Sequence, residues 1–250
     1  VIPHVVLEDL KKREKKSKKF IFPNNCPSCG SPTIKEFNKI TKKHDAVRRC
    51  TNEGYDCEKI AIEKIKHFIS KDAINIDGLG KKVVENFWDL NLIRFPQDIY
   101  NLDYNKISNL EGWGDLSVSN LKYSIDQSKK VSLDRFLYSI GIRHIGIENA
   151  KLLAEHVKSM KNFIILVNKN KFNNFLNIDG IGETQINSLK KFFENKSNYK
   201  IIEKLSSKLN IFDLKLNKDG KLLNNTFMFT GKLSNMSRAE AKSLIEENSG

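Results

Sequence analysis

The sequence has no long apolar stretch. Its longest unbroken run of aliphatic and aromatic residues is Phe163–Val167, whereas a helix that crosses a membrane needs about 20 apolar residues. The first residues also lack the apolar segment of a secretory signal peptide. These absences predict a soluble, cytoplasmic protein without a membrane partner.

Acidic residues are too few to balance the basic ones. The chain has 43 Lys and Arg residues against 30 Asp and Glu residues, a formal net charge of +13 and an isoelectric point near 9.4. Such an excess is typical of proteins that bind nucleic acid. Part of it reflects a composition rich in Lys, Asn and Ile, so the placement of the charges matters more than their number. A dense basic run lies between Lys11 and Lys19, although it is also compatible with a solvated tether.

Cysteine is absent outside one window of 32 residues. Within it stand Cys26, Cys29, Cys50 and Cys57, with the spacing C-x2-C-x20-C-x6-C. Thiolates at such spacing favour one tetrahedral zinc ion, and four of them leave no coordination position for a catalytic water. Disulfide bonds are the alternative, but the window is too small and polar to form its own core without a metal. Cys57 is the least certain ligand, because the second gap is wide.

Glycine is sparse but regularly placed. Four short turns, which we number hairpins 1 to 4, lie between stretches of helical periodicity: Gly78-Leu79-Gly80, Gly112-Trp113-Gly114, His144-Ile145-Gly146 and Gly180-Ile181-Gly182. Their last glycines are 34, 32 and 36 residues apart, which indicates one repeated supersecondary unit. A single Gly-x-Gly turn is more often a plain helix stop, whereas four copies favour a common function.

Each hairpin has the parts of a phosphate site. Glycine permits a positive φ and the close approach of another backbone. The next helix then begins with unpaired N–H groups and partial positive charge, which suits a phosphate. We expect the middle apolar residue of each turn to fill the gap between its two helices. Hairpin 3 has His144 in place of the first glycine and Gly141 three residues earlier, so we expect it to be longer or mainly structural.

Both ends of the chain have the pattern of incomplete domains. Val1–Leu7 is strand-like but has no upstream partner. Near the other end, a strand-like stretch at 226–233 precedes a predicted helix that begins at Ser237. One strand and one helix cannot bury each other's apolar faces, so this segment is expected to be the start of a larger domain.

The order of these parts resembles the C-terminal half of bacterial NAD-dependent DNA ligases. The matching stretches are 26–31, 76–80, 141–146 and 229–231 with Ser237-Arg238. The resemblance implies a mainly α fold with a small four-cysteine zinc module, tandem helix-hairpin-helix repeats and an incomplete α/β BRCT-like segment. The implied boundaries are 1–22 for the end of an oligonucleotide-binding barrel and a basic linker, 23–60 for the zinc finger, 61–212 for four helix-hairpin-helix repeats, 213–221 for a linker and 222–250 for the truncated BRCT-like domain.

The resemblance also implies a role in DNA binding. Such a chain would clamp nicked duplex DNA through its phosphate backbone, without sequence specificity, during replication and repair. The implied DNA-binding residues are Gly78, Gly80, Lys81, Lys82, Gly112, Gly114, Gly146, Gly180 and Gly182. One structural zinc ion would be bound by the four cysteines. A non-enzymatic DNA repair or junction adaptor and a helical interaction scaffold remain as alternatives.

Catalytic residues are not expected in this chain. In the ligase family the nucleophile is the lysine of Lys-x-Asp-Gly, and no such motif occurs here. Lys218-Asp219-Gly220 lacks the intervening residue and is typical of a turn. The resemblance therefore implies that NAD and Mg are bound outside this chain, that its partner is the N-terminal adenylation domain of the same ligase, and that the chain alone is inactive.

Overall fold

The structure is a computed structural model. It describes residues 21–38, 42–52, 54–213, 220–223 and 225–230, together with the single positions 12, 14, 17, 18, 241, 244, 245 and 248. The chain divides into two compact units, residues 1–53 and 54–250, and each is considered separately. The finer domain boundaries given above stay predictions.

The first unit contains two short antiparallel ladders. Strand β1 (Thr33–Ile34) pairs with β4 (Arg49–Cys50), and β2 (Phe37–Asn38) pairs with β3 (Lys43–His44). A tight turn precedes them, in which the Gly30 N–H donates to the Cys26 carbonyl oxygen at 2.9 Å. Gly30 has a φ of +72°, a conformation that glycine adopts without steric cost.

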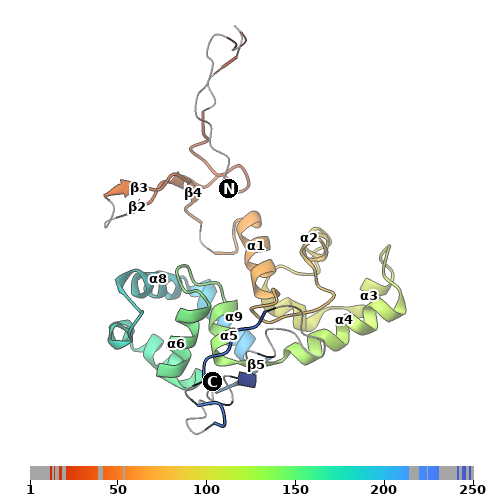
Figure 1. Ribbon diagram of the computed structural model, residues 1–250. Coiled ribbons are helices and arrows are strands. Elements are labelled where there is room, and N and C mark those ends of the chain that lie inside the picture. The colour runs from red at the N-terminus through yellow and green to blue at the C-terminus, as the bar shows by residue number, and fades with distance from the viewer. Residues whose placement is uncertain are drawn as a thin grey trace. The chain divides into compact units, whose positions relative to one another are not determined.

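The second unit is helical, which confirms the mainly α fold class. Figure 1 shows α1 to α4 on one side of this unit and α5, α6, α8 and α9 on the other. Within the described ranges, no helix is long and apolar enough to cross a membrane. The α-helices are α1 (Glu58–Phe68), α2 (Lys81–Asp89), α3 (Tyr104–Ser108), α4 (Asp115–Ser128), α5 (Leu133–Ser139), α6 (Ile147–Val157), α7 (Met160–Asn168), α8 (Glu183–Glu194) and α9 (Lys196–Ser206). The 3-10 helices are η2 (Pro96–Asn101) and η3 (Phe172–Asn177).

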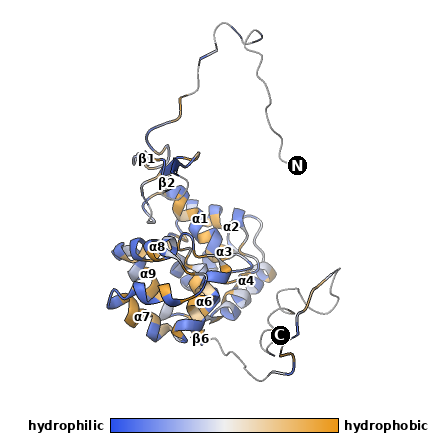
Figure 2. Ribbon diagram, turned by 60° about the vertical axis from the view of Figure 1, so that its left-hand side comes forward, coloured by the Kyte–Doolittle hydropathy of each residue, from blue (hydrophilic) through white to orange (hydrophobic). Residues whose placement is uncertain are grey.

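One hydrophobic core runs through the helical unit. Hydrophilic and hydrophobic residues are interleaved along the labelled helices (Figure 2). Helix α1 packs against α2, α3 against α4 and α5 against α6, while α8 packs against η3. The largest fully buried side chains are Phe68, Phe87, Phe136, Phe163 and Phe175. Burial of apolar surface on this scale holds the four hairpins on a common scaffold.

A short parallel ladder closes the helical unit. Strand β5 (Lys130–Ser132) pairs with β6 (Asn210–Phe212), with Val131 opposite Ile211. The Asn210 N–H also donates to the Lys129 carbonyl oxygen at 2.7 Å. The ladder ties the segment between α4 and α5 to the chain that follows α9.

The C-terminal prediction is not confirmed. Residues Thr226–Thr230 are described and form no strand, so the strand predicted at 226–233 is not formed over that part. Its remaining residues, the helix start at Ser237 and the stretch Val1–Leu7 lie outside the described residues, as does most of the Lys11–Lys19 run. The BRCT-like and barrel-like ends stay predictions.

Candidate nucleic-acid interface and metal centre

The four hairpins share one backbone geometry. In each, the N–H of the middle apolar residue donates to a carbonyl oxygen three residues earlier: Leu79 to Ile76 at 3.4 Å, and Trp113 to Leu110, Ile145 to Ile142 and Ile181 to Ile178 at 3.1 Å. The residue before this middle residue, which is the first of the three that name each hairpin, has a positive φ: +82° for Gly78, +81° for Gly112, +61° for His144 and +86° for Gly180. The residue at i+1 has no positive φ in any of the four, so the hydrogen bond from i+3 to i and the positive φ at i+2 indicate type II turns.

The prediction that hairpin 3 is longer is therefore wrong. His144 adopts the left-handed conformation that glycine takes in the other hairpins, at a cost of about 1–2 kcal/mol for an L-residue. Two contacts hold it there. The Asn149 side-chain amide donates to the His144 carbonyl oxygen at 3.0 Å, and the ring Nδ1 lies 2.9 Å from Ser188 Oγ on α8. The sequence suggested a longer loop because it shows that His144 replaces glycine. It does not show that Asn149 and Ser188 hold His144 in the left-handed conformation.

The last glycine of each hairpin is the N-cap of the next helix. Gly80, Gly114, Gly146 and Gly182 precede α2, α4, α6 and α8 with φ values of −71°, −108°, −81° and −111°. Any L-residue can adopt these conformations. A Cβ added at Gly80, Gly114 or Gly146 would meet nothing within 4 Å, and at Gly182 it would meet only the Gln185 side chain, at 3.5 Å. Neither backbone geometry nor internal packing requires glycine at these four exposed positions.

The middle residues anchor the hairpins in the core, as the sequence predicts. Leu79, Ile145 and Ile181 are buried. Trp113 is half-buried, and its ring lies 5.5 Å from that of Phe87, centroid to centroid. The apolar residue therefore faces inward while both flanking residues of each turn face solvent.

The hairpins fall into two classes. Hairpins 1 and 3 follow the full helices α1 and α5, whereas hairpin 2 follows the five-residue α3 and hairpin 4 follows the 3-10 helix η3. The stretch of helical periodicity before hairpin 4 is thus a 3-10 helix. Hairpins 1 and 3 also have a second positive φ, three residues before the first: at Asn75 (+58°), before Gly78, and at Gly141 (+66°), before His144. Hairpins 2 and 4 have none at that position. The alternation pairs hairpin 1 with 3, and 2 with 4.

The electrostatics of the hairpins follow the same division. From the residue whose carbonyl accepts the turn hydrogen bond to the third helical residue, hairpin 1 has Asp77, Lys81 and Lys82, and hairpin 3 has Arg143, Glu148 and the imidazole of His144. Over the same span, hairpin 2 has Glu111 and Asp115, and hairpin 4 has Asp179 and Glu183. The formal charges are therefore +1 and 0 for hairpins 1 and 3, against −2 for each of the other two.

The N-cap amides differ in the same way. In hairpin 2 the Gly114 N–H donates to Ser117 Oγ at 3.0 Å, and in hairpin 4 the Gly182 N–H donates to Gln185 Oε1 at 3.1 Å. Both acceptors stand three residues into the helix, the position from which a side chain reaches back to the N-cap. These two amides are committed to internal acceptors, which weakens them as donors to a phosphate.

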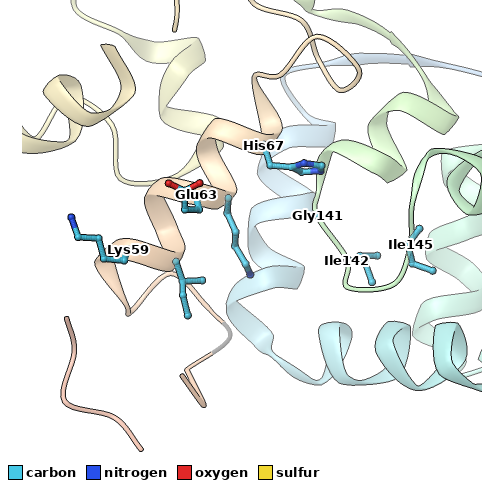
Figure 3. A pocket seen from close by; sticks show the side chains of 8 residues that line it. Lys59, Glu63, His67, Gly141, Ile142 and Ile145 are labelled. Atoms are coloured by element: carbon cyan, nitrogen blue, oxygen red, sulfur yellow. The ribbon is translucent and has the colours of Figure 1, made fainter. Parts of the chain in front are cut away.

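A cavity of about 540 Å³ lies between α1 and hairpin 3 (Figure 3). Its wall on α1 carries Lys59, Glu63 and His67, and across it stand Ile142 and Ile145. The His67 imidazole is already engaged, because its Nε2 lies 2.8 Å from the Tyr138 carbonyl oxygen. The cavity therefore marks the joint between the first and third repeats.

The four cysteines predicted to bind a metal lie together. Their Sγ atoms are all within 4.8 Å of one another, and those of Cys29 and Cys50 are 3.5 Å apart. A tetrahedral zinc ion with bonds of about 2.3 Å to sulfur separates its ligands by about 3.8 Å, so the set fits zinc. Cys57, the least certain ligand from the sequence, is buried and is the N-cap residue of α1.

The thiols of Cys29 and Cys50 differ in pKa, although their sulfur atoms are in contact. Donation from Ser31 lowers the pKa of Cys29 to about 6, while desolvation raises the pKa of Cys50 to about 12. The contact between the two sulfurs adds to both shifts, lowering the pKa of Cys29 and raising the pKa of Cys50. The Asn52 N–H also lies 3.4 Å from Cys50 Sγ. A bound metal ion would replace the thiol protons and receive thiolate from both residues.

Comparison with known proteins agrees with this geometry. Residues 135–202 match the model of the helix-hairpin-helix motif. Over its whole length the chain is 64% identical to a DNA ligase of Pelagibacter ubique (strain HTCC1062). This chain is a homologue of DNA ligases. It is also 40% identical to a DNA ligase of Rickettsia bellii (strain OSU 85-389) over 99% of its length, and 39% identical to that of Sulfurihydrogenibium azorense over 100%.

The chain spans 37%, 37% and 34% of the lengths of these three ligases. The resemblance to DNA ligases inferred from the residues is thereby confirmed. All nine residues predicted to bind DNA lie exposed at the hairpins. Sequence reasoning missed the amide acceptors Ser117 and Gln185. The spacing of three residues from the N-cap glycine was the available signal.

Proposed function

We propose that this chain is the DNA-binding part of an NAD-dependent DNA ligase, and that it holds nicked duplex DNA by its phosphates without reading sequence. The observation that carries the proposal is the N-cap glycine of each hairpin. Gly80, Gly114 and Gly146 have ordinary φ values and open space where a Cβ would lie. Since the protein's own fold does not require glycine there, the close approach of an external backbone explains it best.

A phosphate matches the exposed end of such a hairpin. The first N–H groups of an α-helix have no partner within the helix, and the helix dipole adds partial positive charge to them. Contacts to phosphates position a protein on duplex DNA but carry no base information. This suits a break in the backbone, which occurs in any sequence.

Within this function, hairpins 1 and 3 are the principal phosphate sites. Hairpin 1 presents Lys81 and Lys82 in the first turn of α2, and hairpin 3 presents Arg143. Hairpins 2 and 4 carry two carboxylates each and use their N-cap amides internally. Carboxylates at a helix N-terminus compete with a phosphate for the same positive potential.

Zinc would have a structural role. Four thiolates close the coordination sphere, so the ion would supply folding free energy and no activated water. Cys26 and Cys29 would hold it from the tight turn and Cys50 from the end of β4. Cys57 would hold it from the residue before α1.

Catalysis is proposed to lie outside this chain. The sequence lacks Lys-x-Asp-Gly, so transfer of AMP from NAD, with Mg, belongs to an N-terminal adenylation domain with which this chain would work. A non-enzymatic junction adaptor is less favoured, because similarity to proteins named DNA ligase runs through 97–100% of the chain.

Binding to nicked duplexes of unrelated sequence tests the proposal. If hairpins 1 and 3 each neutralise one phosphate, log affinity falls with log salt at a slope of about −2 or steeper, since each phosphate contributes about −0.9. Equal affinities for the different sequences are expected. Failure to bind duplex at low salt, or a strong preference for one sequence, would overturn it.

A further inference from the structure

The four-cysteine module exposes a pair of rings. Phe37 and His44 stand opposite each other in the β2–β3 ladder. Their ring centroids are 5.1 Å apart, with 63° between the ring planes. Phe37 is 50% exposed, and His44 is exposed as well. The His44 Nδ1 lies 3.2 Å from the Lys35 carbonyl oxygen, which fixes the imidazole in place.

The β1–β4 ladder also pairs an apolar side chain with a polar one that contains nitrogen. Ile34 stands opposite Arg49 in the register of β1 and β4. Ile34 is 43% exposed, and Arg49 is exposed. Side chains directly opposite on antiparallel strands lie within contact distance. The module thus shows apolar surface next to basic groups on both ladders.

The charge around the rings is positive. Residues 21–38 and 42–52 contain two carboxylates, Glu36 and Asp45, and five basic side chains, Lys35, Lys42, Lys43, Arg48 and Arg49. Arg48 is turned inward, because its Nε donates to Thr33 Oγ1 at 3.0 Å. Asp45 is half-buried and lies 4.0 Å from Arg49 Nε. The exposed lysines leave a surface complementary to a polyanion.

We propose that the Phe37–His44 pair is a stacking platform for an unpaired nucleobase, and that the exposed Lys42, two residues from His44, contacts an adjoining phosphate. Aromatic rings stack on any base, and basic groups follow the strand, so such a site needs no particular sequence. Paired bases inside a duplex offer no open face to a ring, which restricts the platform to frayed ends and single strands. The inference rests on the proposed DNA binding and adds a contact that the hairpins do not supply.

The experiment uses the whole chain with two probes, a labelled oligothymidine and a blunt duplex. Phe37→Ala and His44→Ala each remove one ring, and Phe37→Trp keeps a stacking surface. Val47→Ala is the matched control, because Val47 is an apolar side chain of the same module, 55% exposed and outside both ladders. Equal metal content and circular dichroism show that each variant is folded.

We expect Phe37→Ala to weaken binding of the oligothymidine about tenfold, the order of one lost base–aromatic contact. Phe37→Trp and Val47→Ala should bind it like the parent, and duplex affinity should change less than about twofold in all variants. Unchanged oligothymidine affinity in both ring variants overturns the platform. The platform is also overturned if the parent protein binds the duplex but not the oligothymidine. That result would leave the proposed DNA binding by the hairpins intact. A parent that binds neither probe contradicts the proposed function itself.

Discussion

His67 and Tyr138 join the first and third repeats. The His67 Nε2 on α1 lies 2.8 Å from the Tyr138 carbonyl oxygen on α5, and the two rings pack edge to face with centroids 4.7 Å apart. A Cβ added at Gly141 would lie 3.3 Å from the imidazole. The same joint therefore fixes α1, which leads to hairpin 1, against the chain that enters hairpin 3.

Arg135 strengthens this joint and gives the first prediction. Its Nε and Nη2 donate to the carbonyl oxygens of Ala73 and Lys71, each at 2.8 Å. Arg135→Ala should lower the free energy of unfolding by about 2 kcal/mol, because two hydrogen bonds from a charged donor are lost. Urea denaturation measures the change. Lys161→Ala, at an exposed position on α7, is the control and should change stability by less than about 0.5 kcal/mol.

The second prediction separates binding from folding at the hairpins. Gly80→Asp and Gly146→Asp place a favoured N-cap side chain at the start of α2 and α6, so stability should be kept or raised. Affinity for nicked duplex should fall at least tenfold, since a carboxylate then occupies the place proposed for a phosphate. Fluorescence anisotropy and thermal denaturation measure the two effects on the same samples.

Ser159→Asp is the matched control for those variants. Ser159 is the N-cap of α7, outside the hairpins, and its side chain accepts from the Asn162 N–H. The substitution makes the same change of charge at the same kind of position. If it weakened DNA binding as much as Gly80→Asp, the effect would be one of net charge and the assignment of the hairpins would fail.

The third prediction concerns the conformation of His144. His144→Val should destabilise the protein by about 2 kcal/mol more than His144→Gly, because a β-branched residue is a strong outlier at positive φ. Arg143→Val serves as the control at the preceding turn residue, which has no positive φ. Similar stabilities for the two His144 variants would mean that the turn does not hold the left-handed geometry.

The sequence predicted the repeats and the grouping of the four cysteines, because both depend on local spacing. Four Gly-bearing turns at intervals of 32–36 residues locate the helix starts. Four cysteines within one window of 32 residues indicate where a metal site would form. It did not predict the inequality of the hairpins, which depends on long-range contacts. Asn75 and His144 take positive φ values that only the packed structure maintains, and Arg135 bonds a loop more than 60 residues away.

The fourth prediction concerns zinc. The reduced chain should contain one zinc ion per molecule, and chelation should unfold the module, because metal binding and folding are coupled. Cys29→Ser and Cys57→Ser should both lower the zinc content. Ser28→Ala, at an exposed position between the proposed ligands Cys26 and Cys29, should not. Metal analysis showing full zinc in Cys57→Ser would remove Cys57 from the ligand set.

The last prediction distinguishes this chain from the complete enzyme. Without Lys-x-Asp-Gly, it should take up no AMP from labelled NAD and seal no nick. Addition of an N-terminal adenylation domain from a homologous ligase should restore sealing in the presence of Mg. The restored rate should be lower than that of a continuous chain, since separate parts lose translational and rotational freedom on association. Gly80→Asp should reduce the restored sealing while Ser159→Asp does not. Stable covalent AMP on this chain alone would show that it has a nucleophile of its own, and would place catalysis within it.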